Sequence, residues 1–423
     1  MRLVLCILYL VRVIQASDTP DSASTSDGSE TPSCANHRTL WNIVSTCALT
    51  IFACTYSAMH VNIPSPKDSP VRVLLRRAYL ILFALFVPEL LVAWAMRQWL
   101  WAHYAWTQTH SFFALMGGFM LYVDDEPYHI LLPNQLLSLV EDGSIDLPRL
   151  TAKQIHDRSK GNAISKGLIV LQVASFILQL ISRGIYHLEI TLFEVGTLAF
   201  AVLNFITYAV WWNKPLDVQC SHPVYWKSTK AKLAEVSFDG YIYASINSTA
   251  ADYVLLSVSE RDLPLSLEII AVSLLDSTVR LAGFDTTSPQ RLRVAALDGD
   301  IKLDPRESDV LTFAGFVMGT TFGAIHCAAW LYPFPTYPEQ VLWRASAIYI
   351  TFAQWFHLLV YLLFIPKTDK KKTLRLVFIA FFPGIVSYIA ARSILFILMF
   401  TTLRSLHADI FKAVSWANLV PHL

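Results

Sequence analysis

Seven long apolar stretches constrain this chain more than any other feature of its sequence. Each is long enough to supply the ~20 apolar residues with which an α-helix crosses the hydrocarbon core of a bilayer. They lie at residues 40–61, 78–101, 164–183, 188–212, 310–332, 341–365 and 374–403. Only 15% of the 423 residues are charged, whereas soluble domains carry roughly 25% charge. The sequence therefore predicts an all-α membrane protein, a polytopic helical bundle whose first partner is the lipid bilayer. The net charge of +1 does not indicate a nucleic acid partner.

The N-terminus has the pattern of a secretory signal peptide. Met1 and Arg2 precede an apolar run over residues 3–14, which is too short to span a bilayer. Residues 1–16 are therefore interpreted as a signal peptide. Residues 17–39 are rich in Ser, Thr and Asp and are predicted to form a disordered tail. We expect an integral protein of the secretory pathway, in the endoplasmic reticulum or plasma membrane, with its N-terminus on the lumenal or extracellular side.

An eighth, shorter stretch at residues 107–123 is assigned by charge. Basic loops concentrate on the cytosolic side of a membrane. The loops at 67–77 and 367–375 are both basic, so an even number of crossings should separate them. If 107–123 crosses, that number is six, and the chain has eight helices. The predicted division begins with helices one to five at residues 40–212, which include a cytosolic connection at 124–163. A cytosolic loop follows at 213–309. Helices six to eight lie at 310–403, and residues 404–423 form an outer tail.

The cytosolic loop is the largest predicted part outside the membrane. It is long enough for a small subdomain of α+β character. It contains the sequon Asn247-Ser248-Thr249, which should stay unmodified if the loop is cytosolic. Occupancy of Asn247 by a glycan would instead place this loop on the other side.

Ionisable side chains within the apolar stretches are the first candidates for a site. A charge at the centre of a bilayer costs at least ~2.5 kcal/mol, so such residues are retained for a reason. Glu89 and Glu194 are the candidate catalytic residues, and each could instead be paired structurally with an Arg or a His. The candidate pocket residues are Asn204, Gln172, Gln179, His326, His357 and Arg344. Polar stripes such as Gln172 with Gln179 also serve as interhelical hydrogen bonds.

Two further patterns have structural interpretations. Gly315, Gly319 and Gly323 repeat at a spacing of four, which lets a neighbouring helix approach closely. The scattered histidines form no pair with metal-ligand spacing, so no metal site and no cofactor are predicted.

Four stretches carry a resemblance. They are residues 110–119 (HSFFALMGGF), residues 197–218 ending in WWNKPLDV, residues 322–344 beginning FGAIHCAAW, and residues 416–423. In these the chain resembles a large fungal family of multi-pass membrane proteins, most of them uncharacterised. The resemblance implies a signal peptide followed by about eight transmembrane helices, and implies no particular activity. It points to Glu194, His326, Arg344 and the run Trp211–Asp217. Two tryptophans followed by Asn-Lys-Pro also have the pattern of an interfacial aromatic belt and a helix stop. Family members often carry a polar or acidic residue where this chain has Ala114.

Three functions remain open from the sequence. Twelve tryptophans and many other aromatic side chains could line an apolar cavity, so we expect a lipid or isoprenoid-like small molecule to bind within the bundle. One alternative is a membrane-embedded terpene-cyclase-like enzyme, in which Glu89 and Glu194 supply a proton or a base. The other is a receptor, sensor or scaffold that acts through the cytosolic loop. The sequence contains none of the common hydrolase, nucleotide-binding or metalloprotease motifs, so whether the protein is an enzyme stays open.

Overall fold

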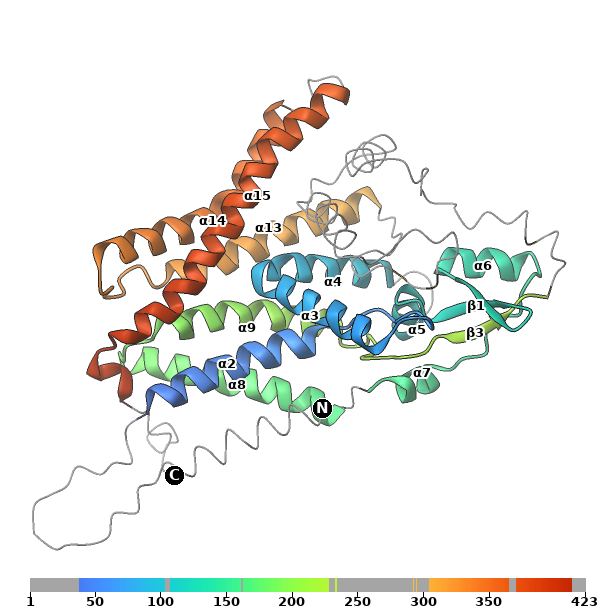
Figure 1. Cartoon of the computed structure of the whole chain (residues 1–423), viewed down its shortest axis with the longest axis horizontal. Coiled ribbons are helices and arrows are strands. Elements are labelled where there is room, and N and C mark those ends of the chain that lie inside the picture. The colour runs from blue at the N-terminus through green and yellow to red at the C-terminus, as the bar shows by residue number, and fades with distance from the viewer. Residues whose placement is uncertain are drawn as a thin grey trace, which may run out of the picture.

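The computed structural model describes residues 38–102, 107–160, 163–227, 304–364 and 370–412, together with the single residues 233, 292 and 294. The predicted signal peptide, most of the N-terminal tail, the Asn247 sequon and residues 413–423 lie outside the described residues. The described part is mostly helical, with one small sheet (Figure 1). The prediction of a helical bundle is therefore confirmed.

Six long helices form the bundle and run along the long direction of the molecule, α15 at an angle to the others (Figure 1). They are α2 (Leu40–Ala58), α8 (Ala163–Ile185), α9 (Leu192–Val210), α13 (Pro305–Cys327), α14 (Tyr337–Phe364) and α15 (Lys370–Thr401). Helix α9 is central, because it contacts α2, α4 (Pro88–Ala102), α8, α13 and α15. Among the described residues, α8, α9, α13 and α15 contain segments long and apolar enough to cross a membrane.

The predicted single helix at 78–101 is wrong. The chain forms α3 (Pro70–Phe86) and α4, which meet at an angle of 110° with Val87 between them. The cause is Pro88, which lacks an N–H and disfavours helical dihedrals at the residue before it. Counted as one bent span, the pair would be the fifth segment that could cross a membrane.

The predicted helix at 107–123 is also wrong. Its first half is α5 (Gln108–Leu115), and its second half is the strand β1 (Phe119–Val123). Gly117 lies between them with a φ of 84°, a conformation that glycine adopts without steric cost. The apolar residues of this stretch are buried in a subdomain core, so hydropathy alone did not distinguish them from a span.

The sheet has three strands in the order β2-β1-β3. β1 pairs antiparallel with β2 (Glu126–Ile130) and parallel with β3 (His222–Tyr225). Helices α6 (Pro133–Glu141) and α7 (Ala152–Arg158) complete an α+β unit around a core that includes Phe119 and Leu121. This unit comes mainly from residues 107–160. A separate α+β subdomain is predicted for the loop at 213–309. Of this loop the structure describes β3, which joins the unit above, and most of the remaining residues lie outside the described part.

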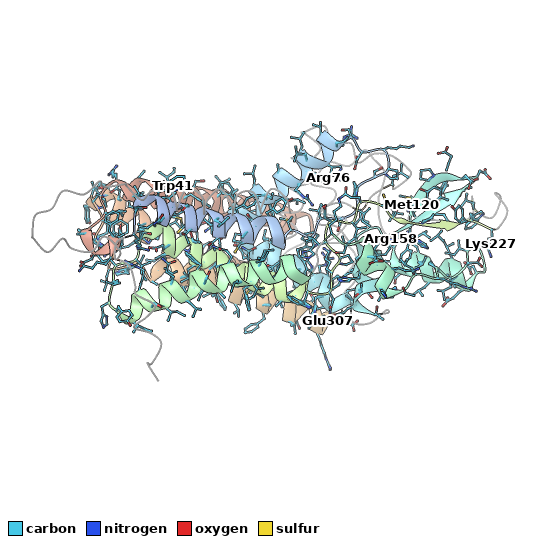
Figure 2. The ribbon with its side chains drawn as sticks, turned by 90° about the horizontal axis from the view of Figure 1, so that it is seen from below. Trp41, Arg76, Met120, Arg158, Lys227 and Glu307 are labelled. Carbon is cyan, nitrogen blue, oxygen red and sulfur yellow. The ribbon has the colours of Figure 1, made fainter. Side chains whose placement is uncertain are left out.

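The two ends of the bundle differ. At one end, here called the terminal end, the Arg38 N–H donates to the carbonyl of Phe411. Two 3₁₀ turns follow α15, η2 (Thr402–Arg404) and η3 (Ala408–Phe411), and Phe411 is the last residue of η3. At the other, the sheet end, the Ile63 N–H donates to the carbonyl of Met116. Figure 2 shows Trp41 at the terminal end and both Met120 and Lys227 at the sheet end.

Candidate functional site

Glu194 lies at the terminal end, in the first turn of α9. Its carboxylate forms a buried ion pair with Arg38, with Oε1 2.5 Å from Nη1 and Oε2 3.2 Å from Nη2. Oε2 also accepts from the N–H and the hydroxyl of Thr191, each at 2.9 Å, and the Thr191 hydroxyl in turn caps the helix. Both oxygens are therefore engaged in holding the start of α9.

The segment after α15 is fixed to the same place. Arg38 Nε donates to the carbonyl of Ile410 at 2.6 Å. The fully buried Arg183 of α8 donates to the carbonyls of Glu189, Asp409, Ile410 and Lys412. Two arginines thus satisfy carbonyl groups that no helix satisfies at this end.

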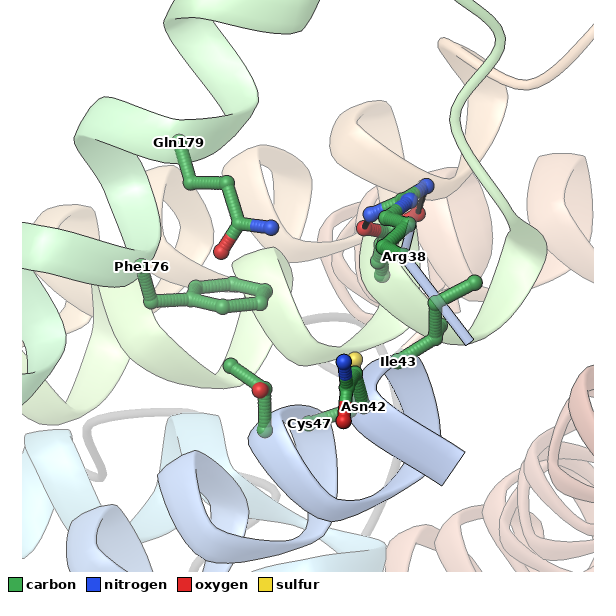
Figure 3. A pocket seen from close by; sticks show the side chains of 8 residues that line it. Arg38, Asn42, Ile43, Cys47, Phe176 and Gln179 are labelled. Atoms are coloured by element: carbon green, nitrogen blue, oxygen red, sulfur yellow. Dashed lines mark hydrogen bonds and ion pairs between the residues drawn. The ribbon is translucent and has the colours of Figure 1, made fainter. Parts of the chain in front are cut away.

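A cleft of about 160 Å³ opens beside the ion pair. Its lining is Arg38, Asn42, Ile43, Thr46, Cys47, Phe176, Gln179 and Glu194. Figure 3 shows Gln179 and Phe176 projecting from α8 toward Asn42 and Cys47 on α2. The structure therefore brings together Gln179 and Glu194, two of the predicted site residues.

Three polar side chains of the cleft are free to bind a ligand. Asn42, Thr46 and Gln179 are half-buried, and their side chains make no hydrogen bond to another described residue. The charges of Arg38 and Glu194 neutralise each other. The cleft therefore offers uncharged donors and acceptors beside the ring of Phe176.

Glu89 lies in a second place, at the start of α4 in the interior of the bundle. Its Oε1 accepts a hydrogen bond from the Tyr388 hydroxyl. Arg392 Nε and Nη2 donate to the carbonyls of Phe86 and Leu85, at 3.1 and 2.9 Å. These carbonyls lie at the break between α3 and α4, so Arg392 supplies the donors that a continuous helix would have supplied.

His326 completes this group. Its Nδ1 is 2.8 Å from the Phe322 carbonyl, and because a carbonyl only accepts, Nδ1 carries the hydrogen. The Arg392 guanidinium lies 4.1 Å from the Phe322 ring centre, and the His326 ring packs against the same ring with 4.8 Å between the ring centres. Glu89, Tyr388, Arg392 and His326 are here called the polar centre.

Sequence reasoning found Glu89 and His326 but missed Arg392 and Tyr388. Arg392 was detectable, because it is a cation near the middle of the last apolar stretch. Which groups it binds depends on the folded chain.

The remaining predicted site residues do not converge. Gln172 donates to the Thr50 hydroxyl at 3.3 Å and links α8 to α2. The Asn204 amide donates to the Phe200 carbonyl of its own helix at 2.8 Å. Arg344 donates to the Trp330 carbonyl at 2.7 Å and lies over that residue's ring. His357 is on α14, and its side chain lies outside the described ones.

Lys214 occupies an aromatic cage just beyond α9. Its buried ammonium nitrogen is 2.8 Å from Gln98 Oε1 and lies 4.0 and 4.8 Å from the ring centres of Trp211 and Trp94. Burial lowers the pKa of Lys214 well below its ordinary value. Sequence reasoning interpreted this run only as an aromatic belt and helix stop. No group of three or more potential metal ligands occurs within the ranges that the structure describes.

Fold and site together define a helical-bundle protein whose described part contains several long apolar helices, a small appended sheet, a polar cleft and a buried polar centre. The chain belongs to DUF8562, a family of unknown function, whose profile matches residues 4–105 and 101–248. No curated protein and no solved structure matches the chain.

Proposed function

We propose that the chain is a multi-pass membrane protein that binds the head group of a neutral, hydroxyl-bearing amphipathic molecule, a lipid or isoprenoid-like compound, in the terminal-end cleft. The observation that carries this proposal is the cleft, in which three polar side chains lie beside an apolar ring and bind no other residue that the structure describes. The proposed topology has six crossings, made by α2, α8, α9, α13, α14 and α15.

The α3–α4 pair enters and leaves at the sheet end in this topology. Arg77 on α3 pairs with Asp217 at 2.6 Å, and Gln98 on α4 binds Lys214, and both partners lie just beyond the C-terminal end of α9. Because the pair returns to its starting side, four crossings separate the two basic loops. The even number expected from charge is kept without the helix at 107–123.

The outer faces of the helices favour a lipid environment. On α3 the exposed large side chains are Val71, Leu74, Leu75 and Leu82. On α8 they are Leu168, Leu171, Leu178, Ile181 and Ile185. Contiguous apolar surface of this kind is rare on soluble monomers and normal on helices that face acyl chains.

The composition of the cleft selects the ligand class. The charges of the Glu194 carboxylate and the Arg38 guanidinium cancel, so a charged head group gains no net electrostatic attraction from the cleft. The amides of Asn42 and Gln179 and the hydroxyl of Thr46 suit hydroxyl groups, which both donate and accept. Drug-sized ligands occupy pockets of roughly 300–1,000 Å³, so a cleft of about 160 Å³ fits a head group only. The apolar tail would lie along the exposed face of α8.

Binding is favoured over catalysis at this cleft. A terpene-cyclase-like reaction needs an acid or a base that can exchange a proton with the substrate. Both oxygens of Glu194 already accept hydrogen bonds from Arg38 and Thr191. The carboxylate therefore acts as a scaffold in this proposal.

The proposal is tested by a substitution that fills the cleft with a larger side chain. The protein is purified in lipid nanodiscs, and co-purified small molecules are identified by native mass spectrometry for wild type and Gln179→Trp. We expect one hydroxyl-bearing compound on the wild-type protein and at least a tenfold loss in the variant. Leu342→Trp is the matched control, because Leu342 is exposed on α14, a helix that contributes no residue to the lining of the cleft. Retention of the compound in Gln179→Trp, or equal loss in both variants, would remove the cleft as its site.

A further inference from the structure

The tip of the α3–α4 pair reaches the middle of the bundle. Arg392, which holds the carbonyls of Leu85 and Phe86, also lies over the ring of Phe200, midway along α9. Interrupted backbone at bilayer depth occurs only where protein buries it or where it lines a water-containing cavity. The polar centre lies at this tip, and none of its four residues lines the terminal-end cleft.

Three buried atoms of the polar centre have no hydrogen-bond partner among the described residues. They are Glu89 Oε2, Arg392 Nη1 and His326 Nε2. Arg392 and His326 are 0% exposed and Glu89 is 8% exposed, so bulk water does not reach them freely. An unsatisfied buried polar atom costs about 1–3 kcal/mol, and more when it is charged. Three on one cluster indicate a bound group that supplies the missing bonds.

The requirements of the three atoms match one water molecule. Arg392 Nη1 donates and needs an acceptor. His326 Nε2 accepts, because Nδ1 carries the hydrogen. Glu89 Oε2 accepts when the carboxyl is ionised and donates when it is protonated. A water can accept from Arg392 and donate to both others, or accept from Arg392 and Glu89 and donate to His326.

We propose that Glu89, Arg392 and His326 enclose one water and form a proton-binding site at the tip of the α3–α4 pair. The bound water satisfies all three atoms whether Glu89 carries the proton or not. Uptake of one proton therefore requires the water to reorient and leaves no buried group unpaired. On release the proton passes from Glu89 Oε2 to this water, which passes one of its own to solvent or to His326.

Within the part of the chain that the structure describes, few charged or titratable groups lie near Glu89. From α15 they are Tyr388 and Arg392, and from α13 it is His326, whose ring packs against Phe322 as the Arg392 guanidinium does. From α9 the contribution is the ring of Phe200 beneath Arg392, and from α3 it is two backbone carbonyls. Arg392 opposes an imidazolium at His326. At Glu89 it favours the carboxylate, whereas burial favours the uncharged carboxylic acid, so Glu89 is the residue at which the proton is bound and released.

The experiment is infrared difference spectroscopy of the full chain in nanodiscs during a pH titration. Among the carboxylic-acid bands of the wild type, we expect one that appears with a single midpoint and is absent from the spectra of Glu89→Gln. Tyr388→Phe removes the hydroxyl that donates to Glu89 and should shift the midpoint. A water band sensitive to oxygen isotope should follow the same midpoint and disappear in His326→Phe.

The control is Glu126→Gln, because Glu126 is exposed on β2. Its titration should match that of wild type. Identical carboxylic-acid bands in wild type and Glu89→Gln at every pH would overturn the proposal. If Glu89→Gln fails to fold, an unshifted midpoint in Tyr388→Phe has the same consequence. None of these readouts depends on the cleft, so failure of the ligand test leaves this site untouched.

Discussion

Two glutamates within apolar stretches have opposite surroundings. Glu194 accepts four hydrogen bonds from Arg38 and Thr191. Glu89 accepts one from Tyr388 and keeps a buried oxygen without a partner in the described chain. The first arrangement is that of a structural ion pair and the second that of a reactive or ligand-binding carboxyl.

Replacement of Glu194 should therefore reduce stability. Glu194→Gln leaves the buried Arg38 charge without a counter-ion, which should lower the free energy of unfolding by about 3–5 kcal/mol. Denaturant titration in detergent measures this. Glu126→Gln, at an exposed position, should change it by no more than about 0.5 kcal/mol. A Glu194→Gln protein with unchanged stability but no bound ligand would show that Glu194 belongs to the binding site instead.

Lys214 should make stability depend on pH in the alkaline range. Its pKa in the folded protein is lowered, while an unfolded lysine titrates near about 10.4. Between these two values the unfolded chain binds more protons, so the free energy of unfolding rises with pH. Below the folded value the Lys214 contribution is constant.

The measurement is the thermal midpoint between about pH 7 and pH 10, the interval below the unfolded pKa. Wild type should gain stability with rising pH relative to Lys214→Met, and Lys227→Met at an exposed site should follow wild type. Parallel curves for wild type and Lys214→Met would contradict a buried, poorly protonated amine.

At the scale of elements, the glycine repeat of α13 is only partly a packing motif. A Cβ added at Gly323 would lie 2.6 Å from Thr351 Cα on α14, whereas at Gly315 it would meet nothing within 4 Å. The repeat is regular in the sequence, but α14 approaches only part of it. The sequence predicted a close helix contact and could not say which glycine makes it.

The two glycines provide a matched pair of variants. Gly323→Ala should destabilise the bundle by about 1–3 kcal/mol, because the backbone of α14 must move. Gly315→Ala should be neutral or stabilise by up to about 1 kcal/mol, since alanine has the higher helix propensity. Denaturant unfolding compares them directly, and equal effects would mean that α13 and α14 do not pack as described.

For the whole molecule, the side on which each loop lies decides the topology. Eight helices and the proposed six crossings agree on most loops. They differ at Thr107, which the eight-helix arrangement places outside and the returning α3–α4 pair places at the sheet end. Thr107 is exposed, so a cysteine there can be labelled.

Thr107→Cys, Glu126→Cys and Lys67→Cys should react with an impermeant maleimide from one side, and Thr336→Cys from the other. The parent chain carries Cys220→Ser, because Cys220 is an exposed free thiol. Labelling of Thr107→Cys from the Thr336 side would restore the eight-helix arrangement and exclude the returning pair.

The sequence by itself determined that this chain forms long apolar helices and that Glu89 and His326 lie within apolar stretches. These follow from local composition, which reports how hydrophobic a segment is along the chain. Only the tertiary structure decided that 107–123 contains a strand and that the stretch around Pro88 forms two helices that meet at 110°. It alone paired Arg38 with Glu194 across 156 residues and Tyr388 with Glu89 across 299. The physical reason is that a buried subdomain core and a lipid-facing span select the same side chains, while the partner of a buried charge is set by the packing of distant helices.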